Sequence, residues 1–90
     1  WNDIAAAVDE ITGNTMYLTL NLARVLAYKE EGLVTSKKEG GDWALKNTPT
    51  QFHPLIQHAM SEYVGSEDIV YDTELAIQYA AYMLDRINRS

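Results

Sequence analysis

The 90-residue chain contains no cysteine. Disulfides and thiolate metal sites are therefore excluded, and nothing in the composition points to an oxidising compartment. The two histidines, His53 and His58, are five residues apart, a spacing that places them on different faces of a helix and argues against a metal site. We therefore expect a cytoplasmic protein without a bound metal.

Basic residues and long apolar runs are also scarce. Seven lysines and arginines stand against thirteen aspartates and glutamates, which gives a formal net charge of −6. Binding to a phosphate backbone needs a basic face, so no nucleic-acid partner is expected, whereas a cationic small ligand is compatible with this charge. No apolar run is long enough to cross a bilayer, and no signal sequence opens the chain, so no membrane partner is expected either. The chain starts at Trp1 rather than methionine, which is compatible with a fragment or a processed product.

The segment Thr15–Gly32 organises the rest of the sequence. Its apolar residues cover nearly every side of a helix, which predicts a central and mostly buried helix. Arg24 lies in its middle. A guanidinium keeps its charge, and placing it among leucines is unfavourable unless an anion meets it. Arg24 is thus either half of a structural ion pair, with Glu39 or Asp42 as its partner, or an anion-binding residue.

Four further helices are expected around this segment. They are Asn2–Ile11, a helix that starts at Ser36 and ends before Thr48-Pro49, His53–Gly65, and a helix that follows residues 66–68 and ends near Asn88. The signals are a left-handed stop at Gly13, a cap at Asn14 or Thr15, a Ser36–Glu39 capping box and a first-turn proline at position 54. We find no strand. The expected fold is all-α, an antiparallel bundle of about five helices forming one domain over residues 1–90.

Helical spacing also predicts the core. The inward residues are Trp43, Ala44 and Leu45 in the third helix and Leu55, Ile56, Ala59, Met60 and Tyr63 in the fourth. In the fifth helix, one side carries Leu75, Tyr79, Tyr82, Met83 and Arg86, with Ala76, Ala80, Leu84 and Ile87 beside them. Gly40-Gly41 weakens the third helix relative to alanine. Close approach of another backbone would explain these two glycines.

No nucleophile–base pair or glycine-rich phosphate loop is present, so the chain has no complete active site and no catalytic residue is assigned. The candidates for ligand contact are Arg24, Lys37, Lys38, Tyr28 and Tyr82. Lys37 falls in the first turn of the third helix, where free N–H groups and the helix dipole already favour an anion such as a triphosphate. In the alternative interpretation, Lys37 and Lys38 are simply solvated.

Several short motifs indicate a family. In order, they are LTLNLAR at 18–24, GLVTSK at 32–37, DWAL at 42–45, FHPLI at 52–56 and YVG at 63–65. Together they resemble the C-terminal helical domain of aminoglycoside adenylyltransferases of the streptomycin/spectinomycin type. The resemblance implies an N-terminal nucleotidyltransferase domain as partner, outside this chain, that holds most of the ATP and Mg²⁺. It also implies that Arg24, Lys37 and Tyr82 contact the nucleotide.

On the drug side, the resemblance implies that Glu10, Asn14 and Tyr17 contact a cationic or polyhydroxylated molecule such as spectinomycin. Family members that accept streptomycin have a tryptophan where this chain has Ala5, so streptomycin is not expected.

A second hypothesis is a stand-alone all-α module that partners a separate nucleotidyltransferase. Ribonuclease activity of the kind found in helical toxins is not supported, because Tyr28 and Glu30, not histidine, follow Arg24 at the required distances.

Overall fold

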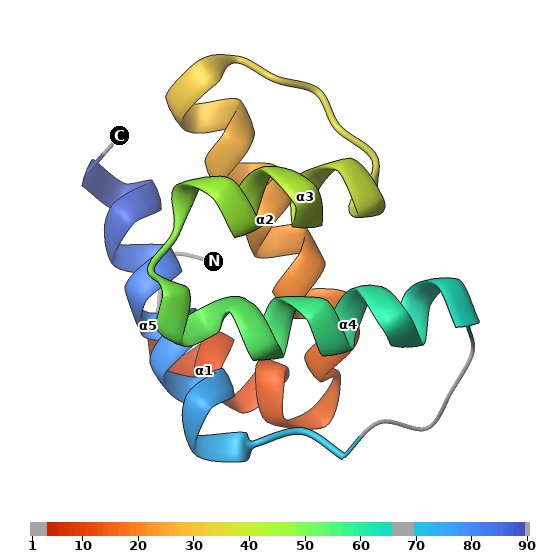
Figure 1. Cartoon of the computed structure of the whole chain (residues 1–90). Helices are drawn as coiled ribbons and strands as arrows, with labels where there is room; N and C mark the ends of the chain where they lie inside the picture. Colours follow the sequence, from red (N-terminus) through yellow and green to blue (C-terminus); the bar gives the residue numbers. More distant parts are fainter. Residues whose placement is uncertain (1–3, 66–69, 90) are drawn as a thin grey trace.

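The computed structural model describes residues 4–65 and 70–89 (Figure 1). The described elements are α1 (Ile4–Gly13), α2 (Thr15–Glu31), α3 (Lys37–Asn47), the 3-10 turn η1 (Thr50–Phe52), α4 (His53–Gly65) and α5 (Thr73–Arg89). No strand occurs in these ranges. The expected all-α bundle of five helices is therefore confirmed.

Helix α2 is the central element, as its apolar pattern predicts. It packs against each of α1, α3, α4 and α5, and Figure 1 shows α3 and α4 crossing it while running in opposite directions. Its buried residues are Leu18, Thr19, Leu20, Leu22, Ala23, Leu26 and Ala27. The buried Tyr79 of α5 donates its hydroxyl to the Thr19 carbonyl at 2.7 Å. Burial raises the pKa of Tyr79, so its phenol stays a neutral donor that ties α5 to α2.

The connection from α2 to α3 is ordered at both ends. Gly32 adopts the left-handed conformation (φ 67°), and its N–H donates to the Tyr28 carbonyl at 2.9 Å. At the other end the predicted capping box is present: Glu39 N–H donates to Ser36 Oγ at 3.1 Å, and Ser36 N–H donates to Glu39 Oε1 at 2.9 Å. These bonds fix a short loop between two helices that contact each other.

The junction between α1 and α2 differs from the prediction. Gly13 belongs to α1, and in the described ranges Gly32 is the glycine with positive φ. Asn14 N–H donates to the Glu10 carbonyl at 2.9 Å, so helical bonding continues through Gly13 and no left-handed stop is needed. Asn14 occupies the N-cap position without a side-chain cap bond, and the Thr15 hydroxyl donates back to the Ile11 carbonyl instead. The expected side-chain cap was therefore wrong.

Two expectations near α4 and α5 also need correction. Tyr63 was expected in the core, but it lies in the last turn of α4 and is 45% exposed. Helix α5 begins at Thr73, later than expected, because Val70, Tyr71 and Asp72 are not helical. Asp72 Oδ1 accepts from Leu75 N–H at 3.1 Å and so caps the helix. The start was expected directly after position 68, and residues 66–69 lie outside the described ranges.

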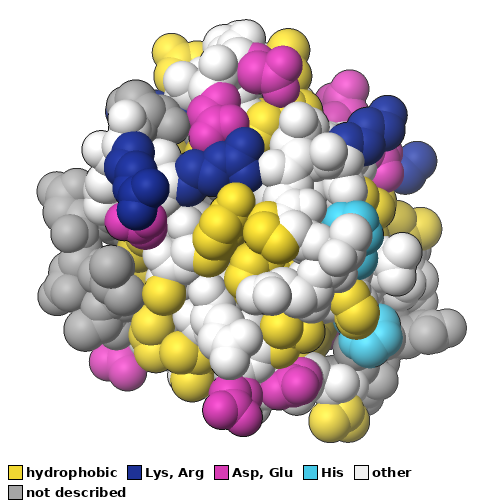
Figure 2. All heavy atoms as spheres, turned by 60° about the vertical axis from the view of Figure 1, so that its left-hand side comes forward, with side chains coloured by type: hydrophobic (Ala, Val, Ile, Leu, Met, Phe, Trp, Pro, Cys, Tyr) yellow, Lys and Arg dark blue, Asp and Glu magenta, His cyan; other side chains and the backbone are white. Residues whose placement is uncertain are grey.

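Arg86 joins the ends of three helices. From α5 it donates Nε and Nη2 to the carboxylate of Glu30 in α2 at 2.6 and 2.7 Å, and Nη1 to the Asn47 carbonyl of α3 at 2.6 Å. The fork of the guanidinium suits this arrangement. On the face drawn in Figure 2, basic side chains lie beside acidic ones. Arg86, which the helical spacing places on the same side of α5 as Tyr79 and Met83, thus connects α5 to the ends of α2 and α3.

The glycine pair at the centre of α3 permits the close approach that the sequence suggests. A Cβ on Gly40 would lie 2.6 Å from Cγ of Arg24 and 3.2 and 3.3 Å from its backbone N and Cα. A Cβ on Gly41 would lie 2.7 Å from Sδ of Met60. Helix α3 therefore touches the backbone of α2 at Arg24.

We expect Gly40→Ala to destabilise the domain although alanine is the better helix former. Overpacking against a fixed backbone is unfavourable by about 1–3 kcal/mol, which outweighs a propensity gain of at most about 1 kcal/mol. Gly13→Ala is the matched control, because a Cβ there meets nothing within 4 Å, and it should stabilise the domain slightly. Chemical denaturation of the two variants measures both changes. A Gly40→Ala protein as stable as Gly13→Ala would contradict the close approach.

Candidate functional site

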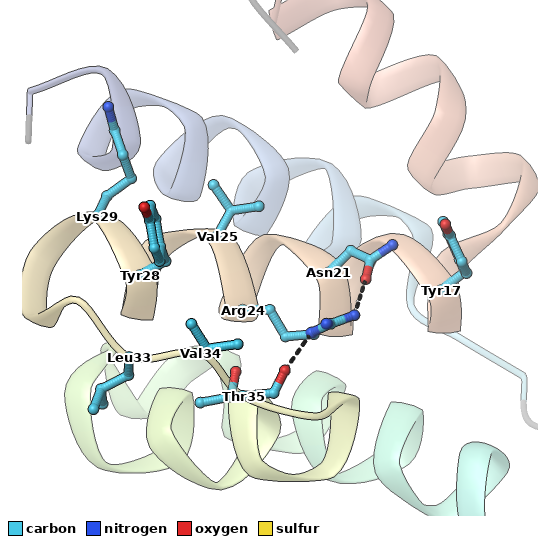
Figure 3. A pocket seen from close by; sticks show the side chains of 9 residues that line it. All are labelled: Tyr17, Asn21, Arg24, Val25, Tyr28, Lys29, Leu33, Val34 and Thr35. Carbon is cyan, nitrogen blue, oxygen red and sulfur yellow. Dashed lines mark hydrogen bonds between the residues drawn. The ribbon is translucent and has the colours of Figure 1, made fainter.

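A groove of about 620 Å³ runs along α2 and the loop that follows it (Figure 3). Its walls are formed by Tyr17, Asn21, Arg24, Val25, Tyr28, Lys29, Leu33, Val34 and Thr35. The volume is typical of a pocket for a small ligand or cofactor. The lining contains two cationic side chains and no carboxylate. The groove therefore favours an anionic group beside apolar surface.

Arg24 lies between the two ends of this groove (Figure 3). Its Nε donates to the Thr35 carbonyl at 2.7 Å, and its Nη1 donates to Asn21 Oδ1 at 3.4 Å. Both acceptors are neutral, so these bonds orient the guanidinium without compensating its charge. The half-buried side chain leaves other N–H donors available to an anion.

Arg24 does not form the alternative ion pair with Glu39 or Asp42. Within residues 4–65 and 70–89, the ion pairs are those of Arg86 with Glu30 and Arg89 with Asp85. Glu39 is instead engaged by the Ser36 backbone and side chain, and these hydrogen bonds lower the pKa of its carboxyl. The capping box occupies Glu39, and no carboxylate among the described residues forms an ion pair with Arg24. The geometry favours the anion-binding interpretation.

Lys37 approaches the same region from the first turn of α3. Its Nζ lies 4.8 Å from the ring centre of Tyr17 in α2 and 5.8 Å from that of Tyr63 in α4. Both contacts are within the range of cation–π attraction. The expectation of two simply solvated lysines therefore fits the exposed Lys38 but not Lys37, which is half-buried between tyrosines.

Two of the six expected contact residues, Arg24 and Tyr17, line the groove, and a third, Lys37, does not line it but lies against Tyr17. Tyr17 links them, because it lines the groove with Arg24 and faces the ammonium of Lys37. Tyr28, which the sequence analysis names as a ligand-contact candidate, also lines the groove. The cluster thus combines two cations with exposed aromatic rings from α2.

The other three expected residues lie elsewhere. Tyr82 packs its ring against Phe52, with 5.3 Å between ring centres, and its hydroxyl accepts from Arg86 Nη1 at 3.1 Å. It does not line the groove. Glu10 and Asn14 are exposed one helical turn apart at the junction of α1 and α2. Their assigned roles, and that of Tyr82, remain predictions.

Sequence reasoning missed several residues of the groove. Asn21 lies three positions before Arg24 on α2, a spacing at which helical side chains meet. The hydrogen bond between them could therefore have been predicted from the sequence. Thr35 contacts Arg24 through its backbone carbonyl, and its buried Oγ1 has no hydrogen-bond partner among the described residues. No sequence pattern shows that contact, because it depends on the path of the loop.

Neither a metal cluster nor a spanning helix is found in the described ranges. No three histidine, aspartate or glutamate side chains come together there in a way that could hold a metal ion. No helix in the same ranges has the length and hydropathy needed to cross a membrane.

Comparison with known proteins agrees with the motifs. The family model described as aminoglycoside adenylyltransferase, C-terminal domain, matches residues 1–86. The curated relatives include aminoglycoside (3'') (9) adenylyltransferases of Klebsiella pneumoniae and Shigella flexneri, each 32% identical over 56 residues, and one of Escherichia coli at 30%. Each match covers 62% of this chain and 21% of the relative, and no solved structure matches significantly. The chain belongs to the family of C-terminal domains of aminoglycoside adenylyltransferases.

Proposed function

We propose that this chain is the nucleotide- and drug-contacting domain of an ATP-dependent adenylyltransferase. The complete enzyme would transfer AMP from ATP to a hydroxyl group of an aminoglycoside-like molecule and release pyrophosphate. The observation that carries the proposal is the charge of Arg24, which has no carboxylate partner among residues 4–65 and 70–89 and is held in a ligand-sized groove by the Thr35 carbonyl and the Asn21 amide. Family membership supports the reaction class, and the curated relatives are adenylyltransferases by name.

Arg24 and Lys37 would act on the phosphates. Negative charge on the leaving pyrophosphate increases as the bond to AMP breaks, and positioned cations that meet this charge lower the barrier. Arg24 is held in place by its two neutral acceptors, and Lys37 stands on the first turn of α3, where the helix dipole also favours an anion. Mg²⁺ and most of the contacts to ATP would belong to the N-terminal domain.

Glu10, Asn14 and Tyr17 would face the drug. Glu10 supplies a carboxylate for a cationic or hydroxylated molecule, and Asn14, one helical turn later, supplies an amide. Tyr17 follows Asn14 by three residues in the chain, lines the Arg24 groove and lies against Lys37. A compact aminocyclitol such as spectinomycin is the substrate that we propose, and the cytoplasm, where ATP is available, is the proposed location.

The full-length protein that contains this chain should release pyrophosphate from ATP in the presence of spectinomycin. The 90-residue chain alone should show no turnover, because it contains no complete active site. A coupled pyrophosphate assay on both proteins makes the comparison. Turnover by the isolated chain, or none by the full-length protein with any aminoglycoside or aminocyclitol, would contradict the proposal.

A further inference from the structure

A single peptide group connects Arg24 to the capping box of α3. Arg24 Nε donates to the Thr35 carbonyl at 2.7 Å (Figure 3), and the N–H of the next residue, Ser36, donates to Glu39 Oε1 at 2.9 Å. The Thr35 carbonyl and the Ser36 N–H belong to the same planar peptide unit. The guanidinium of Arg24 and the carboxylate of Glu39 therefore hold opposite edges of one rigid group.

This peptide group is the closer of the two anchors of Arg24. The bond to Thr35 is short, whereas Nη1 lies 3.4 Å from Asn21 Oδ1, which is longer than a typical hydrogen bond. Residues 32–36 are not helical, so the direction of the Thr35 carbonyl is not fixed by helical hydrogen bonds. The bond from the Ser36 N–H to Glu39 fixes it from the other edge of the peptide.

The order of charges along this chain of bonds is favourable. A carboxylate that accepts from a peptide N–H polarises the peptide and increases the negative charge on its carbonyl oxygen, and hydrogen bonds in such a chain strengthen one another. The carbonyl oxygen in turn accepts from a cationic guanidinium, which makes that bond a charge-assisted one. Glu39 thus acts on Arg24 through the peptide group, without an ion pair between the two side chains.

We propose that Glu39 is a positioning residue for Arg24 and sets the direction in which its guanidinium meets the phosphates. The next residue, Gly40, lies against the stem of the same side chain, because a Cβ there would be 2.6 Å from Cγ of Arg24. Two consecutive residues of α3 thus place the head and the stem of Arg24. This inference rests on the proposed function, which assigns phosphates to Arg24. It adds a residue that touches no ligand to those on which the use of ATP depends.

The two bonds of the capping box provide matched variants. Glu39→Ala removes the acceptor of the Ser36 N–H, so the peptide group can turn and Arg24 loses its oriented carbonyl. Glu39→Gln keeps an acceptor oxygen and should preserve the arrangement. Ser36→Ala removes the other bond, from the Glu39 N–H to Ser36 Oγ, and leaves the peptide group bonded at both edges. Position 39 is exposed, so its truncation leaves no cavity.

Nuclear magnetic resonance of the full-length protein tests the positioning without ATP. In protein labelled with nitrogen-15 arginine, the Arg24 Nε–H signal is assigned by its absence from Arg24→Lys, and its exchange with water is measured. Exchange should be roughly tenfold faster in Glu39→Ala, as expected for the loss of one net hydrogen bond. It should be unchanged in Glu39→Gln and Ser36→Ala. Unchanged exchange in Glu39→Ala, or equal acceleration in Ser36→Ala, would overturn the inference.

Kinetics shows whether the effect reaches ATP through Arg24. Glu39→Ala should lower kcat/KM for ATP by roughly tenfold, the factor given by one net hydrogen bond, and Ser36→Ala should not. In an Arg24→Ala background, Glu39→Ala should have no further effect, because residues that act through one contact are not additive. A second tenfold loss in that background would contradict the positioning, since the effect would then come from another part of α3.

The two proposals fail separately. If Glu39→Ala accelerates exchange of the Arg24 Nε–H but Arg24→Ala keeps wild-type kinetics, the peptide link stands and the phosphate role of Arg24 is wrong. If Arg24→Ala lowers kcat/KM for ATP while Glu39→Ala changes neither exchange nor kinetics, the phosphate role stands and the positioning by Glu39 is wrong.

Discussion

Arg24→Ala in the full-length enzyme is expected to lower kcat/KM for ATP about 100-fold, and Lys37→Ala should have a similar effect. Removing one preorganised donor to developing charge typically lowers the rate by about 10²–10³. The loss should appear mainly as a raised KM for ATP or a reduced kcat, with the KM for the drug little changed. Steady-state kinetics with ATP as the varied substrate gives these values.

The neighbouring lysine provides the control for this prediction. Lys38 is exposed in the same turn of α3 as Lys37, so Lys38→Ala removes one positive charge without removing the proposed phosphate contact. Arg24→Ala also frees the Thr35 carbonyl, which changes the unfolding free energy by only about 1 kcal/mol. Circular dichroism should therefore show a folded protein. If Arg24→Ala and Lys37→Ala both kept wild-type kinetics, the phosphate role would be wrong.

Trp43→Ala should destabilise the domain by about 3–5 kcal/mol, the largest change in stability that we expect here. The indole, carried by α3, is 9% exposed and belongs to the hydrophobic core cluster, so its removal leaves a large cavity. Its Nε1 also donates to the Glu31 carboxylate at the end of α2. Urea denaturation followed by circular dichroism measures the loss.

Trp43→Phe separates the two contributions of the indole. Phenylalanine retains most of the buried ring but cannot donate to Glu31, so this variant should lose clearly less stability than Trp43→Ala. Equal losses in the two variants would show that the hydrogen bond rather than the packed ring supports the core. A Trp43→Ala protein of wild-type stability would contradict the position of the indole.

Local signals predicted most of the fold. The Ser36–Glu39 capping box is confirmed because both of its bonds lie within four residues of each other and need no tertiary partner. The central helix is confirmed: apolar residues lie on nearly all of its sides, and four other helices pack against it. One helix ends and the next begins at Gly13 and Asn14 as expected, but Gly13 is not left-handed and the Asn14 side chain makes no cap bond, because backbone bonds satisfy this junction. The prediction failed at Tyr63 because periodicity cannot show where a helix extends beyond its neighbours.

The candidate site was harder to predict, because its geometry comes from elements distant in sequence. Arg24 was recognised as a charge in an apolar helix, but its hydrogen bond to the Thr35 carbonyl, in place of an ion pair with Glu39 or Asp42, depends on the path of the loop. Lys37 and Tyr17 are 20 residues apart and meet only because α3 packs on α2. No sequence pattern predicts that Lys37 lies beside the rings of Tyr17 and Tyr63.

The most direct test of the central claim is a crystal structure of the full-length protein with Mg²⁺ and a non-hydrolysable ATP analogue. The proposed function predicts phosphate oxygens within hydrogen-bond distance of the Arg24 guanidinium and the Lys37 ammonium, with Arg24 still held by the Thr35 carbonyl. Phosphates bound elsewhere, with Arg24 contacting only Thr35 and Asn21 as it does here, would contradict it.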